Sequence, residues 1–327
     1  MTELDQGLSA YRQMALIRDF ESRLPRFAEE GLIQGSTHPS VGMEASAVGV
    51  SAHLRSGDTV ASNHRGHAHC LAKGADPKRV LAEILGRVDG YCQGRGGSMH
   101  IADKQLGILG TNGVVGAGIG LATGAALRHQ YLGGHEVSVT FFGDGAINQG
   151  IFSESLNLAA IWSLPAIFIC ENNGYAQSSR LSDMVTDTNL TNRARALGVE
   201  ASRVDGMHYW SVSEAARRAV EKARKGDGPS FIQVDTYRFL GHMAGDTEIY
   251  RDRDEVEKWQ ERDPLRILED DLISRLGVQE ETLRSIDEEV TRLIDEAEVF
   301  ARESELPDAH DLQAQVFAIG QRGGADA

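Results

Sequence analysis

Two apolar runs flank a helical pattern near the middle of the chain. Residues 137–142 (VSVTFF) are β-branched and aromatic and predict a buried strand, and residues 166–170 (AIFIC) predict a second one. Between them, apolar residues recur at nearly helical spacing from Gln149 to Ser163. A strand–helix–strand unit of this kind predicts two parallel strands joined by a right-handed crossover.

Polar residues follow both strands directly. Gly143-Asp144-Gly145 comes after the first strand, and Asn172-Asn173 comes after the second. Because ligands bind outside the carboxyl ends of parallel strands, Asp144 and Asn173 are expected to lie together there. A carboxylate, an amide oxygen and a diphosphate together suit magnesium. An isolated GDG turn is more often an ordinary capped loop, but the matching strand end favours the magnesium–diphosphate site.

Similar patterns extend over most of the chain and predict an α/β fold. It consists of a mainly parallel sheet flanked by helices, with a helical C-terminal extension. Residues 1–320 are expected to form one domain that is helical from about residue 250, and residues 321–327 to form a disordered tail. The glycine-rich stretch 87–113 is expected to be a long ordered loop, which is often functional. Helices are predicted at 8–30, 43–54, 76–85, 115–127, 192–197, 213–224 and 283–300, and further strands at 201–204 and 231–236.

The predicted helix at 115–127 carries Gly116, Gly120 and Gly124 on one face. Each glycine costs a helix about 1 kcal/mol relative to alanine, so such a stripe indicates close approach of another helix. Tight packing within the chain and an interface between subunits explain it equally well.

Composition excludes several classes of function. Lys and Arg number 33 against 48 Asp and Glu, a net charge of −15, which argues against nucleic-acid binding. The three cysteines show no CxxC spacing, and the first 20 residues lack the apolar run of a signal peptide. The uncharged stretch 106–127 contains seven glycines and makes a poor membrane span. A cytoplasmic protein without a membrane span is expected.

Histidines gather in residues 64–70 (HRGHAHC). Imidazole and thiolate are good zinc ligands, but no HExxH or paired CxxC supports a zinc site. A scattered set of surface histidines is the other simple reading. By residue type alone, His38 and His242 would be ordinary structural histidines.

Several collinear motifs resemble one family. GDGAINQG followed by ENNGY resembles the thiamine diphosphate motif. Further blocks make the chain similar to the alpha subunit of the decarboxylating component of 2-oxoacid and acetoin dehydrogenase complexes. These blocks lie at 35–45, 64–74, 94–103, 112–119, 203–207 and 236–246, and the similarity runs from about Tyr11 to Ala301.

The resemblance implies a thiamine diphosphate-binding fold with thiamine diphosphate and magnesium as cofactors. It implies that Asp144, Asn173 and the backbone carbonyl of Tyr175 bind the metal, and that His64, Arg65 and His242 bind the diphosphate. Backbone at Gly113, Val115, Gly145 and Ala146 is implied to position the cofactor. His38 and His242 are the implied catalytic residues, which would orient the substrate or assist proton and acyl transfer.

The resemblance also implies partners. A beta subunit would supply the glutamate that activates the cofactor, in an α2β2 heterotetramer, and a lipoyl-bearing acyltransferase would accept the acyl group. The substrate is a small oxo compound. Blocks 64–74 and 236–246 look more like acetoin dehydrogenase alpha subunits, while pyruvate or another 2-oxoacid stays open.

Alternatives and departures from the family pattern narrow these expectations. A transketolase-like two-carbon transfer and a cofactor-free assembly subunit are the other readings. A nicotinamide dehydrogenase is disfavoured, since the third glycine of a GxGxxG fingerprint would be Asn148.

Met43 replaces a glutamine common in the family, which puts local hydrogen bonding in doubt. Met243 replaces the serine of kinase-regulated members, so that regulation is not expected.

Overall fold

A computed structural model describes residues 2–308 of the protein. The disordered tail predicted at 321–327 lies outside the described residues, and the predicted domain limits stay a prediction. No helix in the described part is long and apolar enough to cross a membrane.

Six parallel strands form the central sheet, which confirms the predicted fold class. Strands β3 and β4 pair in register from Ser138↔Ala166 to Gly143↔Glu171. The two strands therefore end side by side, as the strand–helix–strand pattern predicts. In spatial order the strands are β2 (Ile108–Gly110), β1 (Thr59–Ala61), β3 (Ser138–Gly143), β4 (Ala166–Asn172), β8 (Ser230–Asp235) and β7 (Glu200–Asp205).

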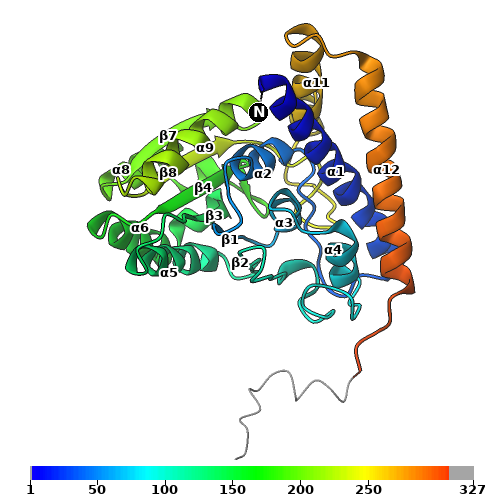
Figure 1. The fold of residues 1–327 in the computed structure, drawn as a ribbon, viewed down its shortest axis with the longest axis horizontal. Helices are drawn as coiled ribbons and strands as arrows, with labels where there is room; N and C mark the ends of the chain where they lie inside the picture. Colours follow the sequence, from blue (N-terminus) through cyan, green and yellow to red (C-terminus); the bar gives the residue numbers. More distant parts are fainter. Residues whose placement is uncertain (1, 309–327) are drawn as a thin grey trace, which may run out of the picture.

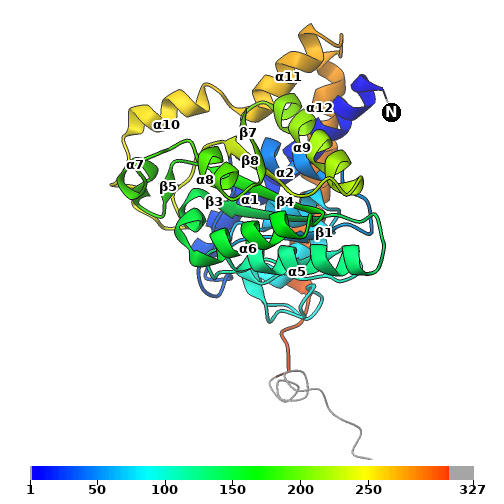
Figure 2. The same ribbon diagram turned by 90° about the vertical axis from the view of Figure 1, so that its left-hand side faces the viewer.

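Helices cover both faces of the sheet, as buried parallel strands require. Phe168 and Cys170 of β4 join the apolar cluster on the face of α5 (Ala117–Tyr131), α6 (Gly150–Ile161) and α8 (Thr191–Ala196). Ile167 and Ile169 point to the opposite face, which α2 (Glu44–Ser51) and α9 (Tyr209–Arg224) cover. Figure 2 shows the sheet between these two layers.

A third group of helices packs beside the sheet around its own apolar cluster. Helices α1 (Glu3–Glu29) and α12 (Glu280–Glu303) lie side by side in Figure 1, and α12 forms the expected helical C-terminal extension. Helices α3 (His67–Ala72), α4 (Pro77–Ile84) and α11 (Pro264–Ser274) join the same cluster. Shorter elements are η1 (Gly97–Met99), η2 (Asp144–Asn148), β5 (Tyr175–Ala176), β6 (Ser179–Arg180), α7 (Leu181–Met184) and α10 (Arg253–Gln260).

The glycine-bearing helix differs from its prediction. It runs from Ala117 to Tyr131, and Gly116 is its N-cap residue with φ +84°, a conformation that favours glycine. A Cβ on Gly120 would stand 3.2 Å from Ile151 of α6, whereas a Cβ on Gly124 would meet nothing within 4 Å. Packing within the chain thus explains Gly120, and Gly124 faces open space.

Candidate functional site

A cavity of about 390 Å³ opens at the carboxyl ends of β3 and β4. All the site residues expected from the sequence line it, although they come from distant segments. They are His38, His64, Arg65, Gly113, Val115, Asp144, Gly145, Ala146, Asn173, Tyr175 and His242.

Buried acidic oxygens occupy one part of this cavity. Asp144 Oδ1 accepts the Gly145 N–H at 2.9 Å, while its Oδ2 is buried without a hydrogen-bond partner in the described part of the chain. Burial raises the pKa of Asp144 to about 6. Oε2 of Glu171 is equally buried and unpartnered among the described residues. Buried carboxylate oxygens are costly unless a cation or donor compensates them, so this region fits a bound magnesium ion.

Asn173 and Tyr175 follow β4 and line the same cavity. Asn173 Oδ1 accepts the Tyr175 N–H at 3.2 Å, which folds the chain tightly after β4. The Tyr175 hydroxyl donates instead to Glu255, at 3.0 and 2.9 Å from its two oxygens. The tyrosine side chain is therefore engaged elsewhere, and only its backbone is left to serve the site.

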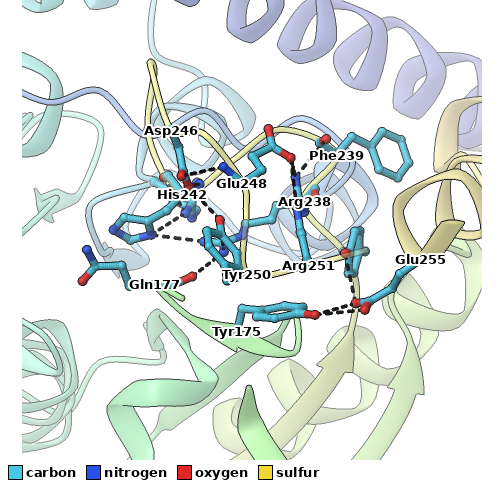
Figure 3. A network of polar contacts seen from close by, with 12 residues as sticks. Tyr175, Gln177, Arg238, Phe239, His242, Asp246, Glu248, Tyr250, Arg251 and Glu255 are labelled. Atoms are coloured by element: carbon cyan, nitrogen blue, oxygen red, sulfur yellow. Dashed lines mark hydrogen bonds and ion pairs between the residues drawn. The ribbon is translucent and has the colours of Figure 1, made fainter. Parts of the chain in front are cut away.

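Two buried guanidinium groups stand at another wall of the cavity. Arg65 is 3% exposed and Arg238 is 1% exposed. Arg65 donates to the carbonyls of Pro39 at 2.7 Å and His242 at 2.8 Å. Arg238 donates to the carbonyl of Gln177 at 2.5 Å and to the Tyr250 hydroxyl at 2.9 Å (Figure 3).

No carboxylate accepts a hydrogen bond from either guanidinium within residues 2–308. Burial, followed by the charge of Arg238, lowers the pKa of Arg65 to about 9. Two adjacent buried cations of this kind call for an anion, and planar guanidinium groups suit phosphate oxygens. Sequence reasoning missed Arg238, although it lies within the 236–246 block.

Three histidine rings meet between these groups. The ring centroids of His38 and His64 lie 4.7 Å apart, those of His38 and His242 4.8 Å apart, and those of His64 and His242 5.5 Å apart. Burial, followed by the charge of Arg65, lowers the pKa of His38 to about 3, of His64 to about 2 and of His242 to about 4. All three rings are therefore neutral at pH 7.

The tautomer of His242 follows from its neighbours. Arg65 Nη2 and Arg238 Nη1 lie 3.2 and 3.1 Å from His242 Nδ1. Guanidinium nitrogens can only donate, so Nδ1 is the acceptor and the proton of the neutral ring sits on Nε2. His242 can therefore offer an N–H donor to a ligand.

Zinc does not suit this arrangement. Candidate ligand nitrogens of His38, His64 and His242 lie within 4.8 Å of one another. However, the two guanidinium groups beside them oppose a cation. The other candidate ligands in residues 64–70 do not join these three histidines. His67 lies against Glu21 and His69 against Glu171, and burial raises the pKa of the Cys70 thiol.

Helix starts supply backbone donors at the cavity. Gly113, Val115 and Gly116 line it just before α5, whose N-cap residue makes no side-chain cap. The free N–H groups of a helix start favour phosphate. At η2, a Cβ on Gly145 would stand 2.7 Å from the Cβ of Ala176, so the close packing there requires glycine.

A hydrogen-bonded loop holds His242 in place (Figure 3). Asp246 accepts from the N–H of His242 at 2.6 Å, the N–H of Glu248 at 3.0 Å and the hydroxyl of Tyr250 at 2.7 Å. Burial opposes the charge of Asp246, but these hydrogen bonds prevail and hold its pKa at about 2. Asp246 and Tyr250 were also missed as site residues, although Asp246 ends the 236–246 block, because their role depends on how the loop folds.

A second hollow, of about 610 Å³, lies at the ends of β4, β8 and β7. Its charged side chains pair with one another, as in Arg203–Asp235 and Arg262–Asp205. Among the residues that the structure describes, it therefore lacks the uncompensated charges that distinguish the first cavity.

Comparison with known proteins identifies the family. The family described as "Dehydrogenase E1 component" matches residues 12–310. The chain belongs to this family. The resemblance found in the sequence is confirmed, and with it the expectation of an oxidoreductase subunit that uses thiamine diphosphate, the cofactor that the family implies.

Relatives match almost end to end. The chain is similar to the alpha subunit of acetoin:2,6-dichlorophenolindophenol oxidoreductase from Bacillus subtilis, with 42% identity over 98% of this chain and 96% of the relative. The subunit of the same name from Cupriavidus necator is 44% identical over 95% and 93%. The pyruvate dehydrogenase E1 component subunit alpha of Rhizobium meliloti is 39% identical over 96% and 90%.

Proposed function

We propose that this chain is the cofactor-anchoring alpha subunit of a thiamine diphosphate- and magnesium-dependent dehydrogenase that acts on acetoin. One observation carries the proposal: among the described residues, a single cavity holds buried carboxylate oxygens that accept no hydrogen bond and buried guanidinium groups that donate to no carboxylate. A magnesium diphosphate group would compensate both sets of charges.

Each site residue has a role in this proposal. Magnesium would be held by Asp144, Asn173 and the Tyr175 carbonyl. The diphosphate would be held by the side chains of Arg65, Arg238 and His64 and by the Nε2–H of His242. The backbone at Gly113, Val115, Gly145 and Ala146 would also contact it. When bound, thiamine diphosphate supplies the carbanion chemistry that cleaves the bond beside a carbonyl.

His38 is the candidate catalytic residue among the cavity residues that have no role in binding magnesium or the diphosphate. Its Nδ1 is buried without a partner in the described part of the chain, and its ring packs edge-on against His64 and His242. A neutral imidazole with a free nitrogen can orient a substrate hydroxyl or carbonyl. His38 and His242 are the proposed catalytic pair.

Acetoin is the preferred substrate because the relatives at 42% and 44% identity are named for it. Pyruvate is the second candidate, since the relative at 39% identity is a pyruvate dehydrogenase subunit. Transfer of the acyl group to a lipoyl-bearing acyltransferase, and a cytoplasmic location, complete the proposal. A transketolase-like transfer and a cofactor-free role have no comparable support.

A beta subunit is the proposed partner, in an α2β2 heterotetramer. The solvent-facing side of α5 and α6, with the loop before α5, carries many of the exposed large apolar side chains, and Val115 continues this surface into the cavity. A partner that covers it would therefore border the site. The surface, hereafter the α5/α6 face, consists of Val114, Val115, Leu121, Leu127, Tyr131, Leu132, Leu158, Ile161 and Trp162.

The test is to co-express the chain with a neighbouring beta-type reading frame and to measure dye reduction. We expect kcat/KM to be higher for acetoin than for pyruvate or branched oxoacids. A higher kcat/KM for pyruvate would show that pyruvate, and not acetoin, is the substrate, and would leave the proposed cofactor chemistry unchanged. Absence of thiamine diphosphate binding by the wild-type complex in magnesium would refute the proposal.

Asp144→Asn gives the sharper test of the metal site. The amide keeps the size of the side chain and removes its charge, so magnesium affinity should fall at least about tenfold in calorimetric titration. Asp187→Asn, at an exposed loop position, is the control and should bind as the wild type does. Unchanged affinity in Asp144→Asn would remove this residue from the site.

A further inference from the structure

Glu83 is a completely buried carboxylate whose partners are all backbone groups. It lies in the last turn of α4. Its Oε2 accepts the N–H groups of Cys92 at 2.7 Å and Gly94 at 2.9 Å. Its Oε1 accepts those of Gly96 at 2.7 Å and Gly97 at 3.1 Å. Four donors from one short segment thus converge on one side chain.

Close packing and backbone conformation require glycine at several positions of this segment. A Cβ on Gly90 would stand 2.6 Å from the Cα of Glu83, and one on Gly96 would stand 2.2 Å from the carbonyl oxygen of His100. Gly94 and Gly97 have φ of +76° and +58°. The chain from 90 to 97, hereafter the glycine segment, therefore wraps the carboxylate as successive N–H groups wrap an anion. A glycine-rich run would otherwise be flexible.

The residues that follow the glycine segment reach the cavity. Ser98 Oγ donates to Thr37 Oγ1 at 3.1 Å, next to His38. Met99 lines the cavity, and its sulfur lies 3.5 Å from where a Cβ on Gly113 would stand. A shift of the glycine segment would therefore move Met99 in the cavity wall and Thr37, the neighbour of His38 in the chain. Neither residue belongs to the groups that carry the uncompensated charges.

We infer that Glu83 is a positioning residue, which fixes the glycine segment and through Ser98 and Met99 sets the cavity wall beside His38. Its kinetic consequence rests on the proposed function, while its structural consequence does not. Substrate turnover is expected to depend on this wall. Cofactor affinity is expected to depend mainly on Asp144, Arg65 and Arg238, with a smaller contribution from the backbone at Gly113, which Met99 approaches.

Glu83→Gln is the test, because its amide NH₂ must face backbone N–H donors. In the full-length chain, trypsin should cleave after the exposed Arg95 at least about tenfold faster than in the wild type, since the segment opens locally. In the complex with the beta-type subunit, kcat/KM should fall about 10- to 100-fold. The dissociation constant for thiamine diphosphate should change by less than about threefold, a difference of under 1 kcal/mol.

Asp58→Asn is the control for loss of charge at another completely buried carboxylate. Asp58 accepts the N–H groups of Arg55 at 2.6 Å and Val137 at 2.9 Å and pairs with Arg224, and none of these partners belongs to the glycine segment. This variant should leave cleavage after Arg95 unchanged. Gly94→Ala is a second probe that keeps the Glu83 carboxylate. Its Cβ would stand 2.5 Å from the Gly86 carbonyl carbon, and a φ of +76° is strained for alanine, so the glycine segment must shift. It should increase cleavage as Glu83→Gln does.

Wild-type rates of cleavage in both Glu83→Gln and Gly94→Ala would overturn the inference. Faster cleavage with unchanged kcat/KM would overturn its kinetic half. If the wild-type complex binds no thiamine diphosphate, the proposed function fails, and the proteolysis still decides whether Glu83 holds the segment.

Discussion

His242 owes its neutral state to burial and to the guanidinium group of Arg65. Its pKa is about 4 in the folded chain against the usual 6.5. Between these values the unfolded chain binds more protons than the folded chain, so folding stability rises with pH. The contribution of the neutral ring is fully present above pH 6.5 and is lost as the pH falls toward 4.

We therefore expect the pH dependence of stability to change in His242→Gln. The melting temperature of the wild type relative to this variant should increase from pH 4.5 to pH 7, because the variant keeps His38 and His64 but lacks the titrating ring of His242. Thermal melts of the cofactor-free chain, followed by circular dichroism across this range, measure the difference. Two parallel curves would show that the ring does not titrate in this way.

The role of Arg238 is expected to require the planar guanidinium group and not only its positive charge. Arg238→Lys keeps the charge but cannot reach Gln177, Tyr250 and His242 together, as the guanidinium does. Thiamine diphosphate affinity should fall about 10- to 100-fold, a loss of about 1.4 to 2.7 kcal/mol, in a fluorescence titration. Arg262→Lys, which changes a half-exposed arginine paired with Asp205, is the control. Equal affinities for the two variants would contradict this role.

The site residues differ in how well they can be predicted from the sequence alone. Asp144 and Asn173 could be placed together because each follows a predicted strand. Arg238 could not, since an arginine after a strand is usually solvated and its burial depends on packing against distant segments. The role of Glu83 could not be predicted either, because the backbone N–H groups that donate to it lie 9 to 14 positions further along the chain.

At the scale of a single element, α5 offers a test of its open glycine. Gly124 lies within the helix and its missing Cβ would meet nothing within 4 Å. Gly124→Ala should therefore stabilise the isolated chain by up to about 1 kcal/mol through helix propensity. Urea unfolding of the chain alone measures this gain.

The same substitution should weaken assembly with the beta-type subunit. If a partner helix approaches Gly124 closely, the added methyl group separates the two helices and reduces their packing. Analytical ultracentrifugation of the mixed subunits reports the change. Improved stability together with unchanged assembly would mean that the glycine serves no interface.

Many elements were predictable from periodicity or a helix cap, the short ones included. The predictions for β3, β4, β7 and β8 and for α1, α2, α4, α6, α8, α9 and α12 each lie within about five residues of the observed bounds. Strands β1 and β2 have three residues each and exist because a neighbouring strand offers an edge, β3 to β1 and β1 to β2. Helix α3 was read only as a histidine cluster, because it is short and its N-cap Gly66 makes no side-chain cap.

For the whole molecule, the α5/α6 face is the strongest sign that the chain does not act alone. The chain carries a net charge of −15, yet the stretch from 106 to 127 has no charged residue. Leu121 is 47% exposed and Ile161 is 65% exposed on this face. Apolar surface of this extent marks an interaction site on a protein that is otherwise acidic.

We expect Leu121→Glu to fold as the wild type does but to lose its partner. Its charge is harmless in water, but burying it at an interface without a counter-ion costs several kcal/mol. Co-purification with the beta-type subunit should fail, while the melting temperature of the isolated chain stays within about 2 °C, as for a surface change of under 0.5 kcal/mol.

Val299→Glu is the matched control for this substitution, since Val299 is 54% exposed on α12, remote from the α5/α6 face. It should assemble normally. Because the cavity borders the α5/α6 face at Val115, Leu121→Glu should also lose dye-reduction activity in the mixture of subunits, whereas Val299→Glu should retain it. A Leu121→Glu chain that assembles with wild-type affinity would place the partner on another surface and leave the exposed apolar residues of α5 without a role.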